Sequence, residues 1–98
     1  MDRYILDGHT PVACPDLMTW GRWFETTERH VANDKVNDVR VSTVFLGLDH
    51  SLGDGPPLLF ETMIFGGPHD QWQDRYETRE AALEGHKRAV FMAREGLH

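Results

Sequence analysis

The stretch from Val39 to Phe65 constrains the fold most, because it holds the densest run of apolar and β-branched residues in the chain. Residues 49–57 divide it into two arms, and their sequence, DHSLGDGPP, is too rich in glycine and proline to continue a strand. The two arms are therefore predicted to pair as long antiparallel strands. We expect the register that places Leu48 opposite Leu58.

This register leaves apolar residues on both faces of the hairpin. One face is predicted to hold Val44, Leu46, Leu48, Leu58, Phe60 and Ile64. The other is predicted to hold Val41, Thr43, Phe45, Leu59, Glu61, Met63 and Phe65. A sheet that faces water on one side alternates apolar and polar residues, which these arms do only near their start. Both faces should therefore need cover, and a slip by one residue would exchange their members without changing this expectation.

The segment before the hairpin is predicted to contain a short strand and a helix. Residues 3–6 could form the strand, with 9–12 as its continuation or return. Pro15 and an acid beside it indicate the start of an amphipathic helix, which we expect to run to about Ala32. Residues 33–38 are then expected to form a polar connection into the hairpin.

The segment after the hairpin is predicted to add an edge strand and a second helix. Apolar and polar residues alternate over 72–76, which favours a strand at a sheet edge. Thr78 can cap a helix that begins at Arg79. The predicted order is β-α-β-β-β-α. We expect an α+β domain with an antiparallel sheet of three or four strands, covered on one face by both helices.

Composition limits the class of protein. With 98 residues, the chain is long enough for one domain, 1–98, that folds without covalent staples. The single cysteine, Cys14, cannot form an internal disulfide, and the acids near the start do not fit a secretory signal. No window approaches the roughly 20 apolar residues of a membrane span. These features predict a cytoplasmic protein with no membrane segment.

The net charge of −6 disfavours one class of partner. Direct binding to nucleic acid relies on clustered lysine and arginine, whereas the 10 bases of this chain are interleaved with 16 acids. We therefore expect no direct nucleic-acid binding. An acidic surface could instead meet a basic groove on another protein.

Three residues could form a small chemical site. Asp49 and His50 end the first arm and His86 lies in the last predicted helix, so the three could converge near one end of the sheet. A histidine with a carboxylate partner is a usable general base, and two histidines with an acid could hold a divalent metal. The chain lacks the usual spacing of metal ligands, however. A histidine in an apolar helical stripe is more often structural, and we expect no metal and no cofactor.

Glu61 is the one ionisable residue in the middle of a predicted apolar face. An unpaired buried carboxylate is costly, or its pKa rises until it binds a proton. Glu61 is therefore expected to pair with a base such as Arg40 or Arg75, to face a wet groove, or to lie in a subunit contact.

Two glycine-bearing loops could also present binding residues. SLGDGPP contains Asp54, and FGGPHD contains His69 and Asp70. Neither loop matches a phosphate-binding glycine motif, but loops of this kind are where binding residues commonly project. The candidate binding set is Asp49, His50, Asp54, Glu61, His69 and Asp70.

The segments VSTVFLGLDH, LLFETMIFGG and YETREAALEGH resemble a family of small uncharacterised proteins encoded by tailed bacteriophages and prophages. The resemblance covers most of the chain and implies a bacterial host cytoplasm and a phage-related role. It implies no catalytic residues. The first hypothesis is a non-enzymatic accessory protein that binds a host or phage protein, such as a counter-defence inhibitor of the anti-CRISPR type. A small enzyme or ligand-binding protein with a site near Asp49, His50 and His86 is the second, and a structural subunit of a phage-derived assembly is the third.

The two apolar faces also predict self-association. Two short helices can cover only one side of the hairpin, and a second copy of the chain could cover the other. We therefore expect a homodimer or a higher closed oligomer. Its interface is predicted to surround Glu61 and to include Val41, Phe45, Leu59, Met63 and Phe65.

Overall fold

The computed structural model describes residues 2–51 and 53–95, and within them the α+β class is confirmed. Six strands and two helices are present in these ranges. In chain order they are β1 (Tyr4–Asp7), β2 (Thr10–Ala13), α1 (Leu17–Thr26), β3 (His30–Val36), β4 (Val39–Phe45), β5 (Phe60–Phe65), β6 (Gln73–Tyr76) and α2 (Arg79–Glu95). None of the described helices is long and apolar enough to cross a bilayer.

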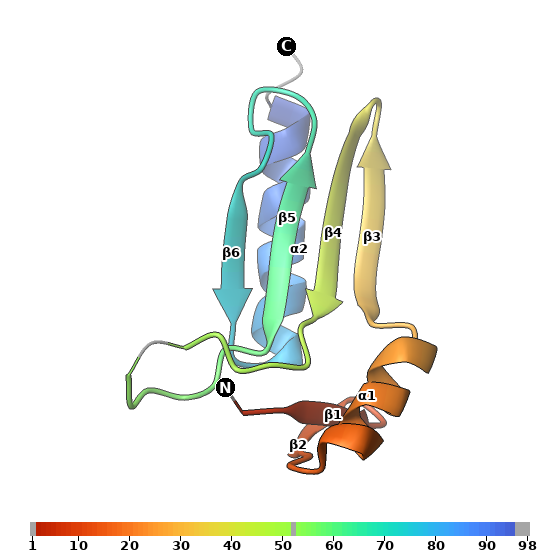
Figure 1. The fold of residues 1–98 in the computed structure, drawn as a ribbon. Helices are drawn as coiled ribbons and strands as arrows, with labels where there is room; N and C mark the ends of the chain where they lie inside the picture. Colours follow the sequence, from red (N-terminus) through yellow and green to blue (C-terminus); the bar gives the residue numbers. More distant parts are fainter. Residues whose placement is uncertain (1, 52, 96–98) are drawn as a thin grey trace.

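The main sheet is an antiparallel meander in the order β3-β4-β5-β6. Helix α2 lies along one face of it, while α1 and the β1-β2 hairpin lie beyond one end (Figure 1). An antiparallel sheet of three or four strands was expected, and the main sheet has four. The expectation that both helices cover it is wrong. Helix α1 packs on β1 and meets the end of the main sheet through Trp23, which contacts Phe45 of β4.

Helix α1 is shorter than expected, and this difference explains its position. The Asp16 side chain caps its start by accepting a 2.9 Å hydrogen bond from the backbone N–H of Thr19. At its other end Thr27 has extended backbone angles, so the helix stops after Thr26. Residues expected to be helix and polar connection form the edge strand β3 instead. A tight turn, with Asn37 at a φ of 55°, then leads into β4.

The register between β4 and β5 differs by one residue from the expected one. Arg40 lies opposite Phe65 and Phe45 lies opposite Phe60, whereas the expected register would have placed each β4 residue one position further along β5. The slip exchanges every β5 side chain between the two faces of the sheet. Phe60, Thr62 and Ile64 therefore share the α2 face with Val41, Thr43 and Phe45.

The core between the sheet and α2 consists of two apolar clusters with a polar layer between them. One cluster contains Val39, Val41, Ile64, Ala89 and Ala93, and the other contains Phe45, Leu59, Phe60, Tyr76 and Ala82. Thr43 separates the two clusters along β4, and Thr62 separates them along β5. These threonines lie opposite each other, and their hydroxyl oxygens are 2.5 Å apart. His86 of α2 completes the layer.

Helix α2 agrees closely with its prediction. It begins at Arg79, and the Thr78 hydroxyl accepts a 3.1 Å hydrogen bond from the Ala81 backbone N–H. Its buried residues are Ala82, Gly85, His86, Ala89 and Ala93, with Leu83 and Val90 partly buried. Gly85 allows the closest approach, because the buried Tyr76 ring crosses directly over its backbone.

The N-terminal hairpin and α1 attach to the sheet through Gly47, two residues after the end of β4. The Gly47 carbonyl accepts hydrogen bonds from the Tyr4 backbone N–H at 2.8 Å and from the Trp20 indole N–H at 3.0 Å. Gly47 has a φ of +77°, and a Cβ atom there would lie 3.2 Å from the Phe24 ring. A glycine is therefore required where α1 meets the sheet.

Candidate functional site: the open face of the sheet

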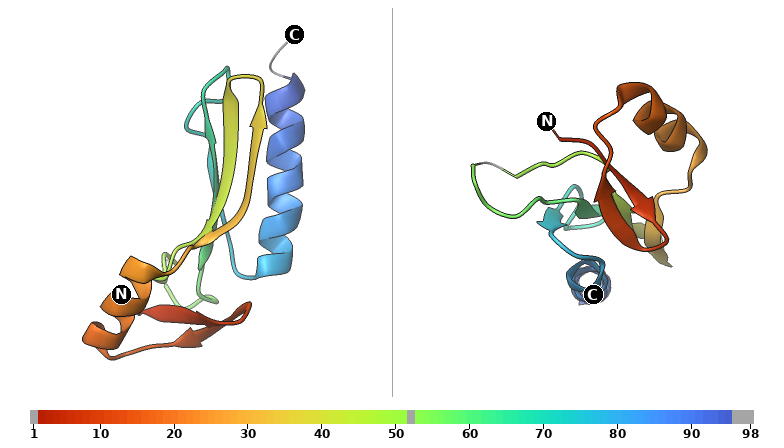
Figure 2. Two further views of the ribbon diagram at one scale, coloured as in Figure 1. Left: turned by 90° about the vertical axis from the view of Figure 1, so that its right-hand side faces the viewer. Right: turned by 90° about the horizontal axis from the view of Figure 1, so that it is seen from below.

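The sheet face opposite α2 is not covered by any element of the described chain over most of its length (Figure 2, left). We call it the open face. Its residues, assigned from the strand registers, are Asn33, Lys35, Arg40, Ser42, Val44, Glu61, Met63, Phe65, Gln73 and Arg75. Val44, Met63 and Phe65 are partly exposed there, so the face presents apolar surface between its polar groups.

Two contacts order the charged side chains of this face. The Arg75 guanidinium donates a 2.9 Å hydrogen bond from Nε to Oε2 of Glu61. This pair matches the first of the alternatives expected for Glu61, a nearby base such as Arg75. The guanidinium of Arg40 lies 4.6 Å from the centre of the Phe65 ring, within the range of a cation–π contact. Each arginine is thus in contact with another side chain of the open face.

The open face is basic in an acidic protein. Among the described residues it carries Lys35, Arg40 and Arg75 against one acid, Glu61, whereas the whole chain has 10 bases and 16 acids. Asp34 and Asp74 are sequence neighbours of two of these bases. Because successive side chains of a strand point to opposite faces, both aspartates lie on the α2 face. The two edge strands therefore place their bases on the open face and their aspartates on the α2 face.

The structure changes the set of residues available for an interface on the uncovered side. Val41 and Phe45 have no exposed surface, because they pack in the core against α2. Their assignment to an uncovered face is therefore wrong, and the one-residue slip in register is the cause. Leu59, which precedes β5, is 2% exposed and belongs to the same cluster as Phe45 and Phe60, so its burial removes it from the predicted interface. Met63 and Phe65 do lie on the open face, with Val44 as their neighbour.

His86 is buried in the polar layer of the core. Its Nδ1 lies 2.8 Å from the Thr43 hydroxyl and its Nε2 lies 2.7 Å from Oδ2 of Asp34. Both ring nitrogens therefore have protein partners, and 5% of the residue is exposed. This geometry holds α2 to β3 and β4 and leaves no ring nitrogen free to act on a substrate.

The other candidate catalytic residues are not gathered around His86. The Asp49 carboxylate closes the loop after β4 by accepting hydrogen bonds from the backbone N–H groups of Ser51, at 2.8 Å, and Leu58, at 3.1 Å. The Ser51 bond is the main reason that the pKa of Asp49 lies below its ordinary value. His50 follows in the same loop and is partly exposed.

The remaining candidate binding residues lie in turns. Asp54 is exposed in the long loop. Asp70 accepts a 2.6 Å hydrogen bond from the Gly66 backbone N–H, and the carbonyl of His69 accepts one from Trp72. Within residues 2–51 and 53–95, no three His, Cys, Asp or Glu side chains are grouped to hold a metal ion.

Comparison of this chain with protein-family models, with curated proteins and with solved structures found no match.

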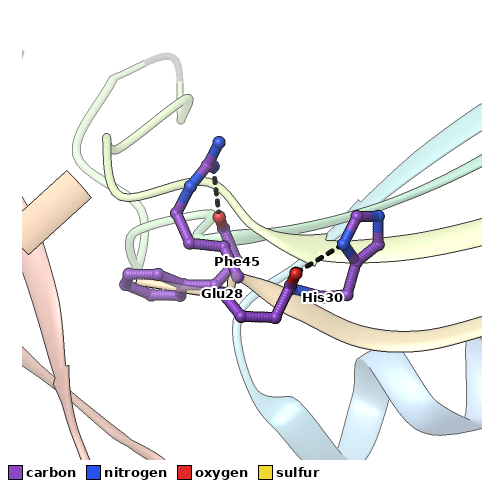
Figure 3. A network of polar contacts seen from close by, with 4 residues as sticks. Glu28, His30 and Phe45 are labelled. Atoms are coloured by element: carbon purple, nitrogen blue, oxygen red, sulfur yellow. Dashed lines mark hydrogen bonds and ion pairs between the residues drawn. The ribbon is translucent and has the colours of Figure 1, made fainter. Parts of the chain in front are cut away.

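Sequence reasoning missed a polar cluster where β3 begins. Nδ1 of His30 lies 2.6 Å from Oε1 of Glu28, which also accepts a 2.9 Å hydrogen bond from the His30 backbone N–H (Figure 3). In a helix that ran to Ala32, as expected, these two side chains would point in different directions. In the extended chain they are two positions apart and lie on the same side. The β-branched pair TT just before them could have signalled the end of the helix.

Proposed function

We propose that the protein acts by binding another protein, and that the open face is the surface that contacts it. One observation supports the proposal most strongly: partly exposed apolar side chains and three bases share a face that α2 does not cover. Apolar surface supplies binding energy and charge supplies orientation and specificity. The charge of the face favours a partner with an acidic surface.

The composition of the open face favours a protein over a nucleic acid. Nucleic-acid surfaces gain affinity from many bases that neutralise successive phosphates. Here Val44 and Met63 occupy the middle of the face, and Arg75 is already paired with a carboxylate. Glu61 would also repel a phosphate backbone. Mixed apolar and charged surface of this kind is typical of protein contacts.

A different protein fits this face better than a second copy of the chain. In a two-fold contact each open face would meet the same face of its partner, so bases would approach bases. Lys35 and Arg40 already lie opposite each other across β3 and β4. The homodimer expected from the sequence stays a prediction, with Val44, Met63 and Phe65 as its apolar residues.

The resemblance to proteins of tailed phages supports a bacterial host protein or another phage protein as the partner. Counter-defence inhibition is one role within this proposal, because such inhibitors act by occupying a surface of a host protein. An enzymatic role near Asp49, His50 and His86 is less favoured, because the hydrogen bonds of Asp49 and His86 are used within the fold.

Variants of the tagged protein in an affinity capture from bacterial lysate would test the proposal. Arg40→Glu reverses one charge of the open face. It should leave the fold intact, because it creates an opposite-charge pair with Lys35 across the two strands. Lys87→Glu is the matched control, since the Lys87 side chain is 73% exposed on the outer side of α2.

The proposal predicts that at least one protein is captured by the wild type and by Lys87→Glu but is lost with Arg40→Glu. Capture should also weaken as salt is raised, because screening reduces attraction between exposed charges. Equal capture by all three proteins would refute the open face as the contact surface. Release of the captured material by nuclease would show that nucleic acid is the partner instead.

A further inference from the structure

A cavity lies where the N-terminal hairpin meets the main sheet, away from the open face. Its volume is about 240 Å³. Its lining comes from the β1-β2 turn, the end of α1, the start of β3, β5 and the first residue of α2. Segments from four parts of the chain therefore converge on it.

The polar groups around the cavity are mostly basic. Arg79 is partly exposed and makes no ion pair with any residue that the structure describes. His9, Arg29 and His30 also line the cavity, and Glu28 is the acid among its lining residues. An anion in the cavity would thus meet the unpaired Arg79 guanidinium and the two imidazoles.

The Glu28 carboxylate accepts hydrogen bonds from His30. Its pKa lies below the ordinary value because it accepts hydrogen bonds from the His30 backbone N–H and from the imidazole. An ionised carboxylate only accepts hydrogen bonds, so Nδ1 of His30 must carry the proton (Figure 3). Glu28 therefore orients the imidazole and leaves Nε2 free for a ligand.

Arg29 has a different role from Arg79. Its guanidinium donates a 3.0 Å hydrogen bond to the carbonyl of Phe45 (Figure 3). The same guanidinium lies 3.9 Å from the centre of the Phe24 ring. These contacts fix the charge at the wall of the cavity. Arg79 has no such contact in the described residues and is the better candidate for a direct contact with a ligand.

The rest of the cavity is apolar. Leu6, Trp23, Val31 and Phe60 line it, and Phe60 has no surface exposed to solvent. An engineered protein cavity of about 150 Å³ holds benzene, so the volume here is sufficient for one ring with a charged substituent. Binding sites for small molecules typically combine such apolar walls with a few convergent polar groups.

We propose that this cavity binds a small organic anion, with a ring or aliphatic body against Trp23 and Phe60 and a carboxylate against Arg79 and His30. We treat the site as a binding site, because within residues 2–51 and 53–95 Thr27 supplies the only hydroxyl of the lining and no basic side chain forms a hydrogen bond with it.

The proposal can be tested by titrating the isotope-labelled full-length chain and recording its amide and indole NMR signals. Benzoate carries both a ring and a carboxylate, benzyl alcohol carries the ring without the charge, and inorganic phosphate carries the charge without the ring. Benzoate should shift the Trp23 indole signal and the His30 amide signal, with a dissociation constant of about 1 mM or less. The other two probes should bind about tenfold more weakly, because each lacks one of the two interactions.

A pair of variants isolates the role of Arg79. Arg79→Met keeps the aliphatic stem and should weaken benzoate binding about tenfold, as loss of a charge-assisted hydrogen bond does. Arg22→Met, on the exposed side of α1, should bind benzoate like the wild type. Equal binding of benzyl alcohol, equal binding of phosphate, or benzoate shifts away from Trp23 would each overturn the proposal, and these three readings need only the wild-type chain.

Discussion

Replacement of Gly85 by alanine tests how tightly α2 packs on the sheet. A Cβ atom at this position would lie 2.1 Å from the Tyr76 hydroxyl oxygen and 2.2 Å from the ring carbon that bears it. Real Cβ contacts are never this short, so either the ring or the helix must move. Tyr76 is 8% exposed and packs in the core with Phe45 and Phe60, which restricts its movement.

Two effects of opposite sign decide the result. Alanine favours a helix over glycine by about 0.8 to 1 kcal/mol. Overpacking a core typically costs about 1 to 3 kcal/mol. Because the whole end of the Tyr76 ring is displaced, we expect the cost to prevail, with a net loss of about 1 to 2 kcal/mol.

Urea unfolding followed by circular dichroism measures this loss. With a slope of about 2 kcal/mol per molar, in the middle of the range for small proteins, the midpoint should fall by about 0.5 to 1 M. Gly21→Ala in α1 is the control, because no atom lies within 4 Å of the added Cβ and the change should stabilise the protein slightly. If Gly85→Ala unfolds at the same urea concentration as the wild type or higher, the close packing of Tyr76 on α2 is wrong.

Three further changes test other parts of the structure. His86→Ala should lower the free energy of unfolding by about 2 to 4 kcal/mol, because it leaves a cavity and removes a partner of Thr43; a loss below about 1 kcal/mol in urea unfolding would contradict the polar layer. Phe60→Ala should cost about 3 to 5 kcal/mol and the partly exposed Phe24→Ala clearly less, and thermal unfolding that ranks them the other way would contradict the assigned core. The pKa of Asp49 is lowered in the fold, so the stability that its hydrogen bonds add to the protein is complete above the unfolded pKa of 3.8. This contribution is lost as the pH falls through the pKa of the folded state. Amide exchange at Leu58 should therefore speed up over that acid range beyond its intrinsic pH dependence, and Asp49→Asn should remove the extra change.

The sequence contained enough information for the class of fold and for most elements. Alternating residues identified β6, and the threonine cap with its apolar stripe identified α2. Register was harder, because both arms of the central hairpin are apolar on both faces and the pattern suits two registers equally well. Thr43 and Thr62 resolve the ambiguity: only the observed register places the two hydroxyl groups opposite each other and against His86. That partner lies 43 positions from Thr43 in the chain, so local pattern alone could not reveal it.

For the candidate sites too, local features could be predicted from the sequence and contacts between distant segments could not. A base as the partner of Glu61 was one of the predicted alternatives, because an unpaired carboxylate between apolar neighbours is costly. The cavity near Glu28 was not, since its lining comes from distant segments and depends on where α1 ends. A helix that ran to Ala32 would point Glu28 and His30 in different directions, so the predicted helix concealed their shared position in the cavity wall.

The two outer strands of the sheet also bear on the risk of aggregation. An unprotected edge strand can pair with the edge of another molecule, and natural sheets prevent this with charged side chains on both sides of the strand. β3 carries Asp34 and Lys35, and β6 carries Asp74 and Arg75, so each edge has an acid on one side and a base on the other. An incoming strand would have to bury at least one unmatched charge at either edge. The charges on β3 and β6 thereby protect the chain against edge-to-edge association, and their bases also give the open face its positive charge.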